Sequence, residues 1–210
     1  MSRIAWLSAI VVLLMFITAF YFYSISPARI ATHWNAAGEV DGYMDKIWIF
    51  LLPVVSLFLF LLLVYLPRLD PLHKNYKYFQ KYYDGFILLL VLFMSFIFLL
   101  TSIWNSFSEF NIVHVMIPAF AVLFFYIGIM MKHTRRNWFV GIRTPWTISS
   151  DRVWNETHRL GGNLFIISGV IAVLGVIFPS YFVWFLLVPV LISAIVPVVY
   201  SYVVFRRMRK

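Results

Sequence analysis

Long hydrophobic stretches alternate with shorter polar segments along the chain. A helix that crosses a bilayer needs about 20 predominantly apolar residues. Six stretches meet or approach that length, namely Ile4–Tyr23, Ile47–Leu66, Phe86–Trp104, Val113–Met131, Asn163–Phe178 and Tyr181–Phe205. The pattern therefore predicts an all-α integral membrane protein with six transmembrane helices. Only Pro179 and Ser180 separate the last two stretches, which are expected to form a tight helical hairpin.

Composition and charge support a membrane protein and give it an orientation. Charged residues make up 12% of the chain, against about 25% in soluble domains. Of the 17 Lys and Arg residues, only Arg29 and Lys46 lie on one side of the predicted spans, and the other 15 lie on the opposite side. Because cytoplasmic loops are enriched in Lys and Arg, both termini are expected to be cytoplasmic. Anionic lipid then accounts for the positive charge, and no direct nucleic-acid partner is expected.

Three regions follow from this layout. They are an N-terminal two-helix unit (1–66) with an ordered outer loop (24–46), a central helical hairpin (67–131), and a C-terminal region (132–210) with a polar island and the final hairpin. The 67–85 loop carries Tyr76, Tyr78, Tyr82 and Tyr83, which are expected to form an aromatic belt at the membrane interface. In the fifth span, Ser168, Ala172 and Gly175 share one helix face and predict a packing surface.

The outer loop is rich in turn-forming and polar residues. Asn35–Gly38 and Asp41–Gly42 are turn signals, because Asn, Asp and Gly accept left-handed backbone conformations. The loop has one histidine and three carboxylates, which is a weak metal pattern since zinc sites prefer more nitrogen or sulfur ligands. No metal is assigned, and a peptide or ligand contact and a structural cap remain the open interpretations. The candidate contact residues are His33, Trp34, Asn35, Gly38, Asp41, Gly42 and Tyr43.

The polar island covers residues 137–162. Gly141 and Pro145 preclude a regular helix at its start, so Arg143 is expected in an irregular turn near the membrane surface. Hydroxyl groups from Thr147 to Ser150 can cap a short helix that runs over 151–160 and ends at Gly161–Gly162. One face of that helix is apolar, which predicts an amphipathic interfacial helix between the fourth and fifth spans.

Several function classes can be weighed from these residues. The alternative to a plain interfacial helix is a docking or ligand site in which Arg143 and His158 face a cavity among the helix ends. An arginine held by tryptophans could bind a carboxylate or a peptide terminus there. A transporter or channel for a small solute or peptide is the alternative, although the spans contain almost no ionisable groups, which transport pathways commonly carry. The sequence has no nucleophile–base set, phosphate loop or metalloprotease signature, so no enzyme, catalytic residue or cofactor is assigned.

The island also carries a family resemblance. Asn137-x-x-x-Gly141-Ile-Arg-Thr-Pro-Trp-Thr147, followed by Trp154, Thr157-His158 and Gly161-Gly162, resembles the signature of the SdpI family of bacterial and archaeal membrane proteins. The segment His33-Trp-Asn-x-x-Gly38-x-x-Asp41-Gly-Tyr43 resembles the small N-terminal domain of unknown function that accompanies this family.

The resemblance implies a multi-pass immunity protein of a prokaryotic plasma membrane. Its expected partners are the lipid bilayer, a secreted membrane-active toxin peptide, and a small cytoplasmic repressor that is held at the membrane. From the predicted topology, we expect the outer loop to be the toxin-facing side and the island to be the partner-binding side. The candidate residues of the island are Asn137, Gly141, Arg143, Thr144, Pro145, Trp146, Thr147, Trp154, Thr157 and His158.

Overall fold

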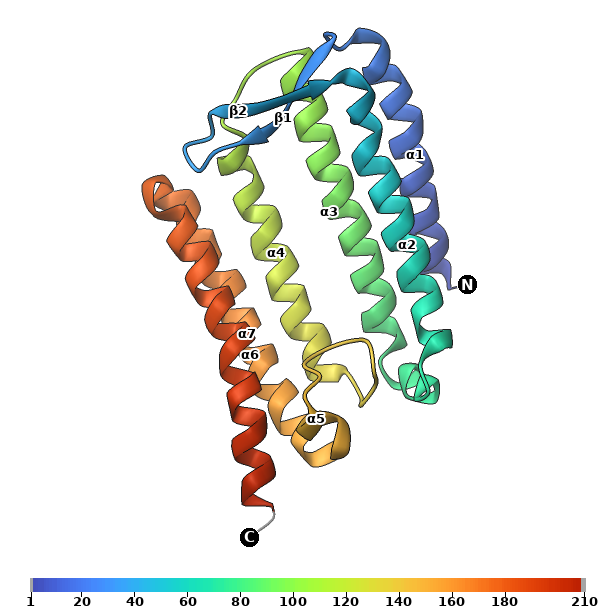
Figure 1. Cartoon of the computed structure of the whole chain (residues 1–210), viewed down its shortest axis with the longest axis vertical. Coiled ribbons are helices and arrows are strands. Elements are labelled where there is room, and N and C mark those ends of the chain that lie inside the picture. Colours follow the sequence, from blue (N-terminus) through green and yellow to red (C-terminus); the bar gives the residue numbers. More distant parts are fainter. Residues whose placement is uncertain (1, 209–210) are drawn as a thin grey trace. The chain divides into compact units, whose positions relative to one another are not determined.

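The computed structural model describes residues 2–208 and is mainly helical (Figure 1). Within these residues, six helices are long and apolar enough to cross a membrane, which confirms the predicted six-helix class. Their bounds are α1 Arg3–Ile25, α2 Leu51–Leu69, α3 Gln80–Ser106, α4 Ile112–His133, α6 Asp151–Ile177 and α7 Phe182–Arg207. The shorter elements are β1 Arg29–Trp34, β2 Val40–Asp45, α5 Pro145–Ser149, and the 3-10 helices η1 Lys46–Phe50, η2 His73–Tyr78 and η3 Pro179–Tyr181.

The chain forms two compact units, each assembled from segments that are distant in sequence. The first unit takes the chain up to Val64 together with Ile87–Ala119, and the second takes Tyr65–Phe86 together with the chain from Phe120 onward. The helices α2, α3 and α4 therefore each contribute one part to either unit.

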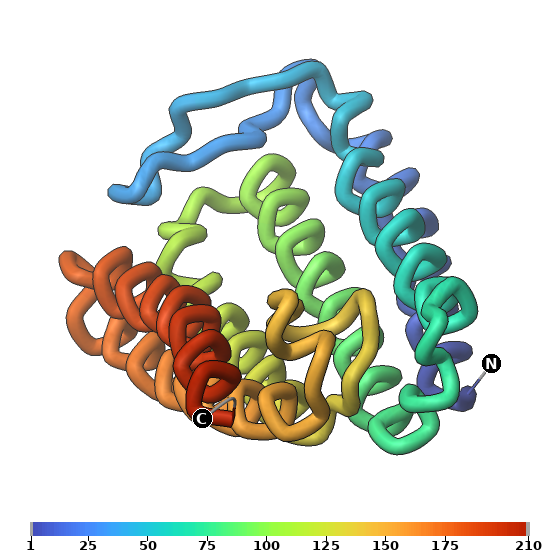
Figure 2. The backbone as a smooth tube through the Cα atoms, turned by 60° about the horizontal axis from the view of Figure 1, so that its bottom comes forward, coloured from blue at the N-terminus to red at the C-terminus, as the bar shows by residue number. Residues whose placement is uncertain are grey.

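The first unit has its core where α1 and α3 approach β1 and η1. Buried side chains from all four elements form one cluster, which consists of Met15, Ala19, Phe22, Ile30, Ile49 and Phe98. The rings of Phe22 and Phe98 meet edge to face, with centroids 6.2 Å apart. At the ends of α1 and α3, the hydroxyl oxygens of Ser26 and Ser106 lie 2.9 Å apart. This packing fixes the base of the β-hairpin that Figure 2 shows between α1 and α2.

The outer loop forms an ordered β-hairpin. Its turn lies at Asn35–Gly38, which confirms the first of the two predicted turns. Asn35 accepts the backbone N–H groups of Ala37 and Glu39 through its side-chain oxygen, at 2.9 and 3.0 Å. Gly38 has φ +83°, a conformation that favours glycine. The predicted turn at Asp41–Gly42 is wrong, because both residues lie inside β2. There Gly42 pairs with His33, whose Cβ would lie only 3.0 Å from a Cβ at position 42.

The second unit contains the α6–α7 hairpin, in which the two helices lie side by side (Figure 1). The short connection through η3 confirms the predicted tight hairpin. The predicted small-residue face of α6 is buried and packs closely. Ser168 bonds Ser193 of α7 at 2.8 Å, and a Cβ at Gly169 would lie 2.7 Å from the carbonyl oxygen of Ala121 in α4.

The predicted separate interfacial helix over 151–160 is wrong. Its start is correct, because Ser150 caps α6 by accepting the N–H of Val153 and Asp151 lies in the first turn. The helix does not end at Gly161–Gly162, however, and α6 continues to Ile177. Neither glycine has the positive φ that a terminating glycine needs. Both instead lie against α4: a Cβ at Gly162 would be 2.7 Å from the carbonyl oxygen of Gly128.

Candidate functional site

The loop between α4 and α6 (residues 134–150, the α4–α6 loop) folds around the buried side chain of Asn137. Its amide nitrogen donates to the carbonyl oxygens of Arg135 and Val140, at 2.9 and 3.0 Å. Its side-chain oxygen accepts the backbone N–H groups of Phe139 and Val140, at 2.9 and 2.6 Å. Asn137 thus satisfies backbone groups that have no regular secondary structure to pair with.

Two residues outside the loop complete this network. The hydroxyl of Tyr76 lies 3.2 Å from Asp70 Oδ2 and 3.3 Å from Asn137 Oδ1, and it donates toward both. Asp70 is buried, and the same carboxylate oxygen accepts the backbone N–H of Trp138 at 2.9 Å. Burial and the charge of Asp70 raise the pKa of Tyr76, so its hydroxyl stays a donor. Sequence reasoning missed Asp70, and it assigned Tyr76 to an interfacial belt and not to this network.

The predicted tyrosine belt in the 67–85 loop is wrong for Tyr76 and Tyr83. Both side chains are buried, and their rings meet edge to face at 5.4 Å. The reason is that polar partners for Tyr76 are available inside the unit, so its hydroxyl need not reach the membrane interface. Tyr78, by contrast, is 62% exposed.

The ring of His158 is buried and supports the loop at Gly141, so the expectation that it faces a cavity with Arg143 is wrong. Its Nε2 accepts the N–H of Ile142 at 2.9 Å, and its Nδ1 donates to the carbonyl of Trp154 at 2.9 Å. This pattern requires a neutral imidazole with its proton on Nδ1. The ring also stacks on the indole of Trp154, which donates to the carbonyl of Thr134 at 3.1 Å. Gly141 has φ +103°, and a Cβ there would overlap Nε2 of His158.

Two threonines start the short helix α5. The Thr144 hydroxyl oxygen accepts the N–H of Thr147 at 3.1 Å, and the Thr147 hydroxyl oxygen accepts the N–H of Thr144 at 2.8 Å. Pro145 occupies the first turn, where a missing N–H costs nothing. Thr144 also bonds Ser201 of α7, with the hydroxyl oxygens 3.1 Å apart. These bonds attach the loop to the α6–α7 hairpin.

Arg143 is an exposed arginine of this loop, as is Arg135. One guanidinium nitrogen donates to the carbonyl of Trp138 at 3.0 Å, and the Trp138 side chain is 49% exposed. Trp146 is partly buried against Tyr202, with ring centroids 5.0 Å apart. The predicted island residues therefore divide by burial. The buried ones are Asn137, Thr144, Thr147, Trp154, Thr157 and His158, and the exposed ones are Gly141, Arg143 and Pro145.

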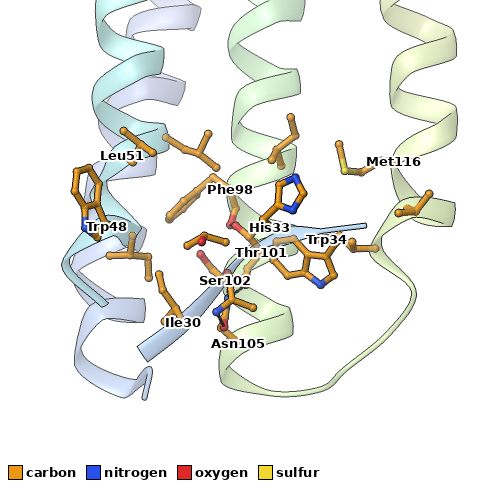
Figure 3. Close-up of a pocket in the computed structure, with 17 residues that line it drawn as sticks. Ile30, His33, Trp34, Trp48, Leu51, Phe98, Thr101, Ser102, Asn105 and Met116 are labelled. Atoms are coloured by element: carbon orange, nitrogen blue, oxygen red, sulfur yellow. Dashed lines mark hydrogen bonds between the residues drawn. The ribbon is translucent and has the colours of Figure 1, made fainter. Parts of the chain in front are cut away.

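The hairpin of the first unit covers a cavity of about 320 Å³. Its wall comes from β1, η1 and the adjoining parts of α2, α3 and α4, and most of the lining side chains are apolar (Figure 3). His33 and Trp34 of β1 line it, and so do Trp48, Phe98 and Ser102. The sequence indicated the two β1 residues. It gave no sign of the cavity, because the other wall residues look like ordinary membrane-helix residues.

The remaining hairpin candidates have separate positions. His33 pairs with Asp41 across the hairpin, and the Trp34 ring meets Trp104 edge to face at 5.5 Å. Asn35 and Gly38 form the turn, Gly42 lies in β2, and Tyr43 is 53% exposed.

Asn105 of α3, which sequence reasoning missed, anchors β1. Its side chain accepts the N–H of Ala31 at 2.7 Å and donates to the Ala31 carbonyl at 3.0 Å. The side-chain amide therefore pairs with β1 as a neighbouring strand would. This anchor holds the strand over the cavity.

Comparison with known proteins places both loops in recognised regions. Residues 133–201 match the SdpI/YfhL protein family, and residues 10–57 match a domain of unknown function (DUF1648). The chain is also similar to the Immunity protein SdpI of Bacillus subtilis (strain 168), with 26% identity over 204 residues that cover 96% of each chain. No solved structure matches the chain. The matches confirm the resemblance seen in the two sequence motifs.

Proposed function

Because the chain belongs to the SdpI/YfhL protein family, we propose that it protects its cell from a secreted, membrane-active toxin peptide. The observation that carries this proposal is the extent of the similarity to Immunity protein SdpI, which covers 96% of both chains. The similarity therefore includes both the hairpin and the α4–α6 loop. The protein is a multi-pass membrane protein, and we assign it to a prokaryotic plasma membrane and give it no enzymatic reaction.

The proposed orientation puts both termini and the α4–α6 loop in the cytoplasm. It rests on the charge distribution, in which 15 of the 17 Lys and Arg residues belong to one set of segments. The hairpin then lies outside, where a secreted peptide arrives first. Its exposed side chains include Tyr43 and Met44, and Trp48 follows in η1. Exposed aromatic side chains at the membrane surface suit contact with an amphipathic peptide.

The α4–α6 loop is proposed to hold a small cytoplasmic repressor at the membrane. The framework around Asn137 and His158 fixes the backbone near Arg143. Its exposed guanidinium has further N–H donors that bond no group within residues 2–208. A carboxylate on the repressor could accept two of them in a charge-assisted pair. The exposed Trp138 side chain beside it would add apolar contact area.

A toxin challenge tests protection. A sensitive bacterial host that expresses the chain is expected to survive, whereas the same host with an empty vector is not. Tyr43→Ala should reduce survival, while Tyr78→Ala, which removes another exposed tyrosine from the 67–85 loop, should leave it unchanged. Full sensitivity of cells that carry normal amounts of the protein in the membrane would contradict the proposal. Solute flux through proteoliposomes without any protection would favour a transporter instead.

Repressor retention needs its own measurement. The fraction of a fluorescently tagged repressor at the membrane is expected to fall with Arg143→Ala. It should stay normal with Arg159→Ala, which removes an exposed arginine from α6. Arg143→Lys should restore only part of it, because lysine keeps the charge and lacks the planar fork. Unchanged retention in the Arg143→Ala strain would refute this role of the loop.

A further inference from the structure

The cavity beneath β1 contains a hydroxyl group without a hydrogen-bond partner among the described residues. Ser102 lines the cavity and is only 2% exposed, and its Oγ bonds no other group. The indole nitrogen of Trp34, on the β1 side of the wall, is likewise buried without a hydrogen-bond partner. Buried polar groups in native proteins are almost always paired, so both atoms call for a partner outside the chain.

The neighbouring polar groups show why Ser102 is left over. A serine in a helix usually bonds back to the carbonyl four residues earlier, which here belongs to Phe98. The Thr101 hydroxyl already donates to that carbonyl at 3.0 Å. Asn105 bonds the carbonyl of Thr101 at 2.8 Å and also anchors β1. The other polar side chains of α3 at this level are thus used within the chain, and the Ser102 hydroxyl remains for a ligand.

The size and lining of the cavity indicate the class of that ligand. At about 320 Å³, the cavity lies at the lower end of the roughly 300–1,000 Å³ found for small-molecule sites. Its walls include Ile30, Trp48, Leu51, Phe98 and Met116 (Figure 3). One linear apolar chain suits this space, whereas a folded peptide does not. A peptide backbone would also bring an N–H group at every residue, and each would need an acceptor in an apolar cavity.

The position of the cavity points to lipid as the source. It lies where α3 ends and where α2 and α4 begin, and the ends of a membrane-spanning helix are where it meets water. Tryptophans are enriched at the membrane–water boundary, and Trp34 and Trp48 both line the cavity. We propose that the cavity binds a linear acyl chain whose ester or carboxyl carbonyl accepts a hydrogen bond from Ser102. This site goes beyond the proposed immunity function, although Trp48 belongs both to the cavity wall and to the exposed surface proposed for the peptide.

Two matched probes test the hydrogen bond. One is 1-monolauroylglycerol, which carries an ester carbonyl, and the other is 1-O-dodecylglycerol, which has an ether in its place and a chain of equal length. The full-length protein is kept in a steroidal detergent, which has no alkyl chain to compete, and binding is followed by native mass spectrometry. The wild type should bind one molecule of the ester probe. Its affinity for the ester should be roughly 2- to 10-fold higher than for the ether, which is the difference that one neutral hydrogen bond implies.

Two serine variants provide the controls. Ser102→Ala should remove the preference for the ester, so that both probes bind alike. Ser56→Ala should preserve it. Ser56 is a serine of the first unit that is also buried without a hydrogen-bond partner in the described part of the chain, and it does not line the cavity. Both substitutions leave the backbone unchanged, and equal elution profiles would show that both variants fold.

Several results would overturn the proposal. These are non-saturable binding of both probes, equal binding of ester and ether by the wild type, and an ester preference that survives in Ser102→Ala. Mass analysis of what leaves the purified wild type on unfolding distinguishes the sources: a free fatty acid or a glycerolipid supports the site. A bound peptide without any acyl lipid would assign the cavity to a different ligand and refute it.

Discussion

The contact between Gly141 and His158 gives a quantitative test of how the α4–α6 loop is held. Gly141 has φ +103°, and a Cβ there would overlap the ring nitrogen that accepts the N–H of Ile142. A left-handed conformation costs a non-glycine residue about 1–2 kcal/mol. Displacing the ring leaves the N–H of Ile142 unpaired, at a further cost of about 1–3 kcal/mol. Gly141→Ala should therefore lower the free energy of unfolding by about 2–5 kcal/mol.

A double-mutant cycle separates the two contributions. In a His158→Ala background the ring is absent, so Gly141→Ala should cost only the backbone part, about 1–2 kcal/mol. The two substitutions should therefore couple by about 1–3 kcal/mol. Gly38→Ala is the control, because its φ is also positive, at +83°, while its added Cβ would meet only the exposed side chain of Asn111.

The assay is heat-induced loss of monodisperse protein in detergent, measured for the four chains of the cycle and the control. Gly141→Ala should shift the midpoint well below that of Gly38→Ala in the wild-type background. In the His158→Ala background its additional shift should become similar to that of the control. If Gly141→Ala cost as much without His158 as with it, the ring would not be the obstacle and this account of the loop would be wrong.

Three further predictions concern the rest of the framework. Asn105→Leu should speed hydrogen exchange at the Ala31 amide by at least about tenfold, because both side-chain bonds to β1 are lost; unchanged protection would argue against the anchor. Burial raises the pKa of Tyr76 above its ordinary 10.0. The neutral hydroxyl therefore makes its full contribution to the free energy of unfolding below pH 10, and this contribution is lost as the pH rises toward and through the raised pKa. Heat midpoints measured up to pH 11 should thus fall more for the wild type than for Tyr76→Phe. Gly169→Ala should lower the heat midpoint more than Gly161→Ala, because its Cβ would meet helix backbone 2.7 Å away, whereas that of Gly161 would meet flexible side-chain ends.

Hydropathy was sufficient to predict the six helices, because each must cover its own backbone polar groups in an apolar layer. It could not decide how α6 continues. Gly161–Gly162 has the composition of a helix end, and also of a helix surface that packs closely. Whether the helix ends or continues at these glycines depends on whether α4 packs against them, and that contact is set by the tertiary structure. The second turn signal at Asp41–Gly42 failed similarly, since strand pairing with His33 determined its conformation.

The candidate sites were predictable to the extent that they are local. The motif from Asn137 to Thr147 contains its own hydrogen-bond partners, and the sequence places them within a few residues of each other. Asp70 and Tyr76 lie more than 60 residues away, and neither belongs to a recognisable pattern. Ser102 likewise resembles any small residue in a membrane helix until its neighbours' bonds are known. Long-range partners therefore require the structure.

The burial pattern of the motif also determines what mutational loss of function would mean. Asn137, Thr147 and His158 are buried and bonded within the loop, so they cannot touch a partner in this conformation. Replacing any of them would unfold the loop and remove Arg143 from its position. A scan that found all of these residues essential would thus not define a contact surface. Only a substitution that leaves heat stability unchanged and still abolishes repressor retention identifies a contact, and among the island's charged residues Arg143 is where we expect it.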